Sequence, residues 1–75
     1  MNIYEEKEKF VRHELLKLCQ RISPDVLHLI YERNKNSEES VTIYWILPNK
    51  GTHKKIVNVT ADSLRSLAFD VIKYI

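Results

Sequence analysis

The 75-residue sequence contains only one cysteine, one glycine and two prolines, and it has no long apolar run. A single cysteine excludes an internal disulfide framework and any cysteine-based zinc site within one chain. A single glycine excludes the glycine-rich loops that cradle phosphates. No apolar stretch approaches the roughly 18 residues that a membrane span requires. We therefore expect a protein without disulfides, without a phosphate-cradling loop and without a membrane segment.

The composition is that of a small globular domain, with 44% hydrophobic and 29% charged residues. We expect residues 1–75 to form one domain. A chain this short, with no disulfide and no evident metal site, has a thin stability margin, and association with a second copy would improve it. The acidic start, Met1 to Glu6, differs from the basic and then apolar start of a secretory signal, so a cytoplasmic protein is expected. The formal charge of +2 gives only a weak preference for anionic partners.

Two segments have the apolar periodicity of helices. Residues 3–21 place apolar side chains on one helical stripe, with Asn2 as N-cap and Glu5 as its capping-box partner. The members of this stripe are Val11, Leu15, Leu18, Cys19 and Ile22. Residues 61–75 predict a second amphipathic helix, which Thr60 can cap. Its stripe consists of Leu64, Leu67, Ala68, Val71, Ile72 and Ile75.

Residues 41–47 and 53–59 predict a β-hairpin. Both are rich in β-branched side chains, and the segment between them contains the only glycine, Gly51. A three-residue loop of residues 49–51 would place Trp45 opposite Lys55, with Ile43 opposite Val57 and Val41 opposite Val59. Trp45 would then share the core face with Ile43 and Val57.

Residues 26–33 are ambiguous between strand and helix. Ser23-Pro24-Asp25 is a reasonable helix start, but the apolar run is short and a polar, turn-rich segment follows it. A lone hairpin is marginally stable, and a third strand would support it, so a strand is favoured. The predicted fold is α+β and two-layered: a helix, a three-stranded antiparallel meander and a helix, with both helices on one sheet face.

No catalytic or metal-binding arrangement is recognisable. His13, His28 and His53 lack the spacing of metal ligands, so no metal and no cofactor are expected. Cys19 belongs to the apolar stripe of the first helix, where cysteine usually behaves as a small buried hydrophobe. We therefore expect a protein that is not an enzyme.

The other sheet face carries an apolar group that predicts a protein interface. Tyr44, Ile46 and Ile56 would be exposed together if both helices cover the opposite face, and exposed apolar patches tend to mark interfaces. The alternative is that Tyr4, Phe10 or Tyr74 folds over them. The leading hypothesis is a non-catalytic binding module that interacts with a protein or with itself, most simply as a homodimer.

A group of basic residues supports a second hypothesis, nucleic-acid binding through the hairpin. Its members are Lys50, His53, Lys54 and Lys55, with Arg33 and Lys35 in the other loop. Lysines on a short edge strand also block edge-to-edge aggregation, which is the commoner explanation. The predicted order of elements is similar to that of the double-stranded-RNA-binding domain. That family has a Gly-rich and Lys-rich start of its second helix, whereas this chain has residues 61–63, Ala-Asp-Ser, so none of the family's binding residues carries over.

Overall fold

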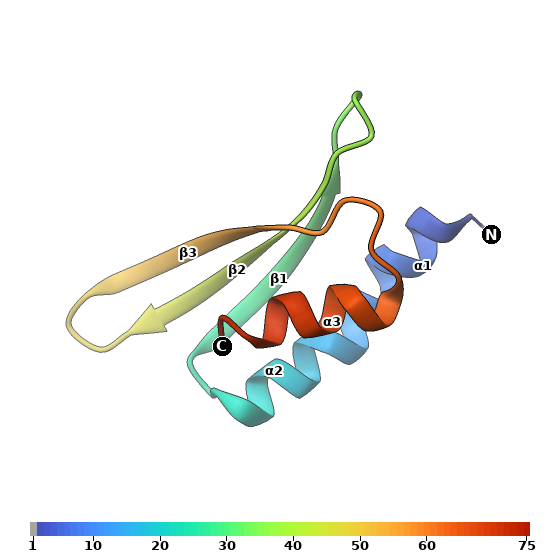
Figure 1. Ribbon diagram of the computed structural model, residues 1–75. Helices are drawn as coiled ribbons and strands as arrows, with labels where there is room; N and C mark the ends of the chain where they lie inside the picture. Colours follow the sequence, from blue (N-terminus) through green and yellow to red (C-terminus); the bar gives the residue numbers. More distant parts are fainter. Residues whose placement is uncertain (1) are drawn as a thin grey trace.

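The computed structural model, which describes residues 2–75, has the predicted order of a helix, three strands and a helix (Figure 1). The sheet is an antiparallel meander in the order β1-β2-β3. Its strands are β1 (Val26–Arg33), β2 (Glu39–Leu47) and β3 (Gly51–Asn58). Residues 26–33 are thus a strand, and the α+β class is confirmed.

The N-terminal helix runs without a break from residue 3 to residue 22 and contains one π-helical segment. Its parts are α1 (Ile3–Lys9), the π-helical η1 (Phe10–Leu15) and α2 (Leu16–Ile22). The predicted cap is confirmed, because the Asn2 Oδ1 accepts a hydrogen bond from the Glu5 amide at 2.9 Å.

The buried stripe of this helix differs from the predicted one. Lys7, Val11, Leu15 and Cys19 are buried at a constant spacing of four residues. In a regular α-helix of 3.6 residues per turn such a stripe would drift around the axis, and the wider turns of η1 offset this drift. The prediction that Leu18 and Ile22 share the stripe was wrong, since both are exposed.

The β2–β3 hairpin forms, but its register is shifted by two residues from the predicted one. Leu47 pairs with Gly51, so that Trp45 faces His53 instead of Lys55. The Lys50 amide donates to the Leu47 carbonyl at 3.0 Å, and Asn49 has a φ of 66°. Proline followed by asparagine suits the two central positions of a type II turn, which closes the loop one residue earlier than expected.

The shift by two leaves the facing of the side chains unchanged, because strand side chains alternate with period two. Val41 now faces Val57, and Ile43 faces Lys55. Trp45 packs against the core that contains Ile43 and Val57, so the predicted sharing of one face is confirmed.

The C-terminal helix, α3 (Leu64–Ile72), is shorter than the predicted 61–75. The Ser63 side chain caps it by accepting from the Ser66 amide at 3.1 Å. Thr60 is not the cap, because its Oγ1 accepts from the Glu39 amide at 2.9 Å. Ala61 has a φ of 62°, a left-handed conformation from which a helix cannot begin.

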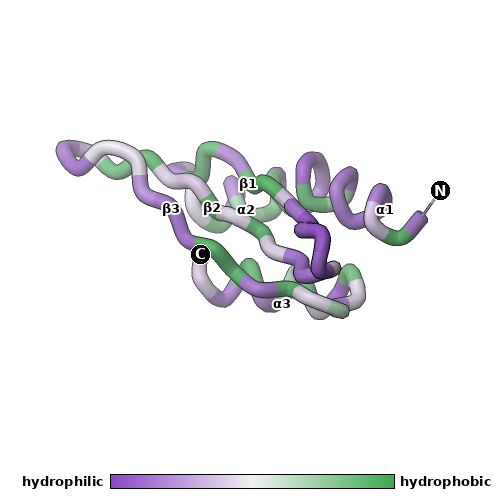
Figure 2. Tube along the Cα trace, turned by 90° about the horizontal axis from the view of Figure 1, so that it is seen from above, coloured by the Kyte–Doolittle hydropathy of each residue, from purple (hydrophilic) through white to green (hydrophobic). Residues whose placement is uncertain are grey.

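The N-terminal helix and α3 lie side by side on one face of the sheet and share its core (Figure 1). The buried core consists of Val11, Leu15, Cys19, Val26, Leu29, Val41, Ile43, Val57, Val59, Leu67 and Val71. The turns at the two ends of the sheet are hydrophilic (Figure 2). Within residues 2–75, no helix combines the length and the apolar character needed to cross a membrane.

Candidate interaction surface

The sheet face opposite the helices, called here the outer face, consists of three cross-strand rows and the end of the hairpin. The basic row is His28, Tyr44 and Lys54; the central row is Ile30, Thr42 and Ile56; the acidic row is Glu32, Ser40 and Asn58. Beyond the basic row, Ile46 faces Thr52. All these side chains point away from the core because they alternate with its residues along each strand.

Large apolar side chains of the outer face are exposed to solvent. Ile56 is 61% exposed, Ile46 49% and Ile30 40%. Thr42, at the centre of the sheet, is only 6% exposed. The Tyr44 ring is half-buried beside the His28 ring, with centroids 5.1 Å apart. The predicted interface residues Tyr44, Ile46 and Ile56 therefore lie on one face. Of the two residues that the sequence suggested could join them, Ile30 lies on this face, whereas Tyr31 packs against the core.

The aromatic residues that could have covered this face contact other parts of the molecule. Tyr4 lies under the Arg33 guanidinium, with the carbon Cζ 3.7 Å from the ring centroid. Phe10 packs against the core on the helical side. Tyr74 lies beside Lys55, on the core side of β3, with the Nζ 4.9 Å from its ring centroid. The apolar part of the outer face has no cover within residues 2–75.

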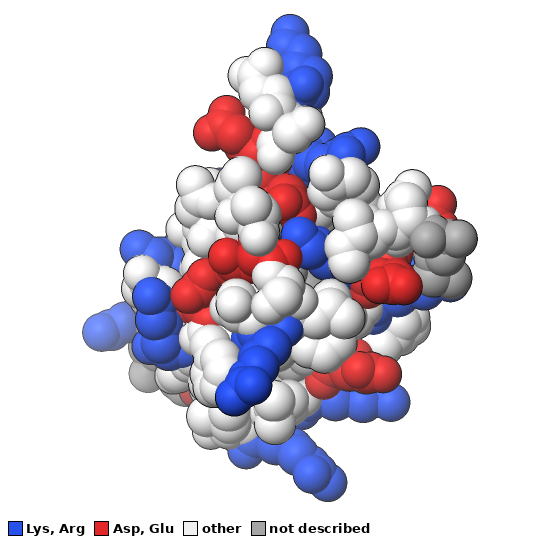
Figure 3. Space-filling model, turned by 45° about the vertical axis from the view of Figure 1, so that its right-hand side comes forward, with Lys and Arg blue, Asp and Glu red and all other residues white. Residues whose placement is uncertain are grey.

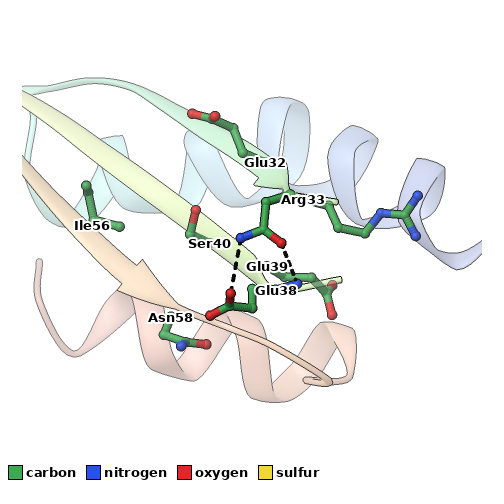
Figure 4. A pocket seen from close by; sticks show the side chains of 8 residues that line it. Glu32, Arg33, Glu38, Glu39, Ser40, Ile56 and Asn58 are labelled. Atoms are coloured by element: carbon green, nitrogen blue, oxygen red, sulfur yellow. Dashed lines mark hydrogen bonds between the residues drawn. The ribbon is translucent and has the colours of Figure 1, made fainter. Parts of the chain in front are cut away.

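A cavity of about 310 Å³ lies at the acidic end of the outer face (Figure 4). The acidic row and Ile56 line it together with Arg33, Asn34, Glu38 and Glu39. The Asn34 side chain donates to the Glu38 carboxylate at 3.3 Å and accepts from the Glu38 amide at 3.0 Å, which holds Glu38 at the rim. The cavity thus combines an apolar wall with exposed carboxylates, a combination that suits the stem and ammonium group of a lysine.

The basic residues of the hairpin lie on two faces. Lys54 belongs to the outer face, whereas His53 and Lys55 point to the core side of β3. Lys50 lies in the turn between β2 and β3. Side chains alternate between the two faces of β3, so the basic residues that predicted a nucleic-acid contact do not lie on one face.

Arg33 and Lys35 lie at the other end of the sheet. Arg33 ends β1, and Lys35 is in the turn that follows it. The nine residues of β2 separate this turn from Lys50 by roughly 30 Å at about 3.3 Å per residue. On the face drawn in Figure 3, basic and acidic side chains are intermingled. The six predicted contacts do not form one basic surface.

A buried polar cluster on the helical side was missed in the sequence. The Lys7 Nζ lies 2.6 Å from the Glu39 Oε1, and the side chains are 4% and 3% exposed. The Tyr31 hydroxyl donates to the same oxygen at 2.6 Å, and the Ala61 amide donates to Oε2 at 2.9 Å. Burial raises the pKa of Glu39, but the hydrogen bonds from Lys7, Tyr31 and Ala61 outweigh it and hold the pKa below its usual value. Burial, followed by the hydrogen bond to Glu39, raises the pKa of Tyr31.

Asp62 lies beside this cluster. Burial, and next the neighbouring Asp70 carboxylate, raise the pKa of Asp62 to about 6. Its Oδ2 is buried and has no hydrogen-bond partner in the described part of the chain. Burial disfavours the charged carboxylate, and a proton on this group would also supply a donor for Asp70; for both reasons the neutral form is favoured.

Two patterns in the sequence could have located the buried pair. Glu39, Val41 and Ile43 follow one another at intervals of two residues along β2, so Glu39 lies on the same core face as the two apolar residues. Lys7 precedes Val11 by four residues and so continues the buried stripe of the helix. Charged residues are usually read as solvated, and for this reason the pair was overlooked.

The residues considered for catalysis and metal binding are scattered. Cys19 is buried, and burial raises its pKa to about 11, so little thiolate forms near neutral pH. His13 lies in η1, His28 on the outer face and His53 on the core side of β3. Among residues 2–75 no group of three or more His, Cys, Asp or Glu is placed to hold a metal ion.

Comparisons with known proteins gave no match to a family model, to a curated protein or to a solved structure.

Proposed function

We propose that this chain is a non-catalytic binding module that associates with itself through the outer face. The main support is the exposure of Ile30, Ile46 and Ile56 on a face that no other part of residues 2–75 covers. Ile30 and Ile56 flank Thr42 in the central row, and Ile46 lies two rows away on the same face. Exposed apolar side chains that gather on one face of a small domain are typical of interfaces. Covering them would also add apolar burial to a chain whose own core is small.

The outer face is small, so the proposed dimer is weak and reversible. Three strands about 4.8 Å apart and eight or nine residues long cover roughly 14 Å by 26 to 30 Å. This is well below the roughly 800 Å² that each partner buries in an interface of standard size. We expect a dissociation constant on the order of 10 µM or higher.

Sedimentation equilibrium between about 10 and 500 µM, a range that brackets this constant by mass action, tests the proposal. The unchanged protein should move from monomer to dimer mass. Ile56→Lys and Ile30→Lys should stay monomeric, because each would bury unpaired ammonium groups at the centre of the interface. Ile22→Lys is the matched control, since Ile22 is 53% exposed on α2, away from the sheet face, and should leave dimerisation unchanged.

A monomer at every concentration would contradict self-association. A dimer that persists in both outer-face variants would place the interface elsewhere. Circular dichroism of each variant separates a loss of dimer from a loss of folding.

Nucleic-acid binding through the hairpin is the alternative, and its signature is an affinity that falls steeply with added salt. Its six residues are spread over both ends and both faces of the sheet. Nucleic-acid binding therefore has less support than self-association through the outer face. A cytoplasmic location, expected from the sequence, is part of the proposal.

A further inference from the structure

On the outer face itself, the side chains at the two ends carry opposite charge. At the acidic end Lys35 lies in the turn after β1, and Arg33, which also lines the cavity, alternates to the core side, where its Cζ is 3.7 Å from the Tyr4 ring centroid. Lys54 is in the basic row, and Glu32 is in the acidic row, with Glu38 at the rim of the adjacent cavity. Four residues along β2, from Tyr44 to Ser40, separate the rows by roughly 13 Å. The exposed isoleucines of the central row lie between them. A face with this polarity is complementary to itself when one copy is turned end to end.

Two sheets that pack face to face as a symmetric dimer have a two-fold axis in the plane between them. If the axis runs across the strands at the central row, β3 of one copy lies over β3 of the other, and the basic end of each outer face lies over the acidic end of the other. Lys54 then lies over the partner's Asn58, at the wall of the partner's cavity, and His28 lies over the partner's Glu32. The central row meets itself, so that each copy shields the other's Ile30 and Ile56 from water.

An axis along the strands gives a different result. It keeps each end over the same end and exchanges β1 with β3. Lys54 would then meet the partner's His28, and Glu32 would meet the partner's Asn58. No attraction between unlike charges forms in that arrangement, and the cavity receives no cation.

From this difference we infer that the partner of the outer face is a second copy turned end to end, with Lys54 of each copy seated in the carboxylate-lined cavity of the other. This inference rests on the proposed self-association and specifies its geometry. The lysine stem lies on the Ile56 wall, and the ammonium group faces Glu32 and Glu38 at the rim. Each dimer has two such contacts, related by the axis.

Charge exchange tests the inference. Lys54→Glu places a carboxylate against the partner's carboxylates, and Glu32→Lys with Glu38→Lys places cations against the partner's Lys54. Each of these proteins alone should dimerise at least tenfold more weakly than the unchanged protein. Mixed in equal amounts, they should recover a heterodimer, because in the mixture both contacts join opposite charges.

Lys55→Glu is the matched control, since it makes the same charge change one residue away, on the core side of β3. It should leave the affinity of the dimer within about twofold of that of the unchanged protein, because an exposed charge outside the interface contributes little to the free energy of association. An equal loss in Lys55→Glu and Lys54→Glu would mean that net charge is responsible, and would overturn the inference.

The outcomes also separate the inference from the proposed function. If Ile56→Lys abolishes the dimer but Lys54→Glu leaves it unchanged or strengthens it, the outer face is the interface and the end-to-end geometry is wrong. A mixture that stays monomeric likewise rejects this geometry. If the unchanged protein never dimerises, the proposed function fails and the inference fails with it.

Discussion

The Lys7 ammonium and the Glu39 carboxylate form a buried ion pair that joins the N-terminal helix to the start of β2, with Nζ and Oε1 2.6 Å apart. The same carboxylate accepts from the Ala61 amide and so also holds the connection between β3 and α3. One side chain thereby fixes three segments that are distant in the sequence. We expect this contact to orient both helices on the sheet.

Breaking the pair from one side should be strongly destabilising. Lys7→Met leaves a buried carboxylate without its counter-ion, and such a change typically costs about 3 kcal/mol or more. Adding Glu39→Gln should recover part of the loss, because the amide is neutral and its oxygen still accepts a hydrogen bond. Urea unfolding of the single and double variants measures both effects.

The exposed pair of Arg12 and Glu8 provides the control, because its side chains are more than half exposed and 3.4 Å apart. Arg12→Met should change the free energy of unfolding by less than about 0.5 kcal/mol. A similar cost for Lys7→Met and Arg12→Met would contradict the structural role of the buried pair.

The stability should depend on pH through Asp62. Its pKa in the folded protein, about 6, lies above its ordinary value of 3.8, so the folded state binds this proton more tightly. The resulting stabilisation is complete below about pH 4 and is lost as the pH rises through about 6. Asp62→Asn should therefore raise the melting temperature at pH 7.5 and leave it nearly unchanged at pH 4. An equal gain at both values would show that the proton is not the cause.

Cys19 should behave as an inert core residue. With the thiol buried and its pKa raised to about 11, a disulfide reagent should react slowly with the native protein and rapidly after denaturation. Cys19→Ala should cost on the order of 1 to 2 kcal/mol, as for other small buried side chains. Rapid modification of the native protein at pH 7.5 would contradict the burial of the thiol.

The β2–β3 turn depends on two residues in the left-handed region, Asn49 with a φ of 66° and Gly51 with a φ of 76°. A Cβ added at Gly51 meets no atom within 4 Å, so Gly51→Ala should cost only the backbone strain, about 1 kcal/mol. Asn49→Gly should be neutral or slightly stabilising, because glycine adopts this conformation readily. Thermal unfolding of both variants checks the turn, and a neutral Gly51→Ala would contradict it.

The sequence by itself determined the order of elements, the α+β class and the faces of the strands. These features follow from local periodicity, and a period of two leaves the face of Trp45 unchanged even when the register shifts by two. The register depended on the position of the turn. A turn centred on Pro48 and Asn49 and a loop of residues 49–51 closed by Gly51 are both compatible with the local sequence.

Tertiary structure decided which helical stripe is buried and which charges lie inside. The π-helical segment aligned Lys7 with Cys19, and the alternation of β2 brought Glu39 to meet the lysine across 32 residues of sequence. The same alternation divided Lys54 from Lys55 and left the opposite charges of Lys54 and Glu32 at the two ends of one exposed face. Contacts of this kind join side chains from different elements. Local periodicity can place each residue on a buried face, but it does not show which partner the residue will meet.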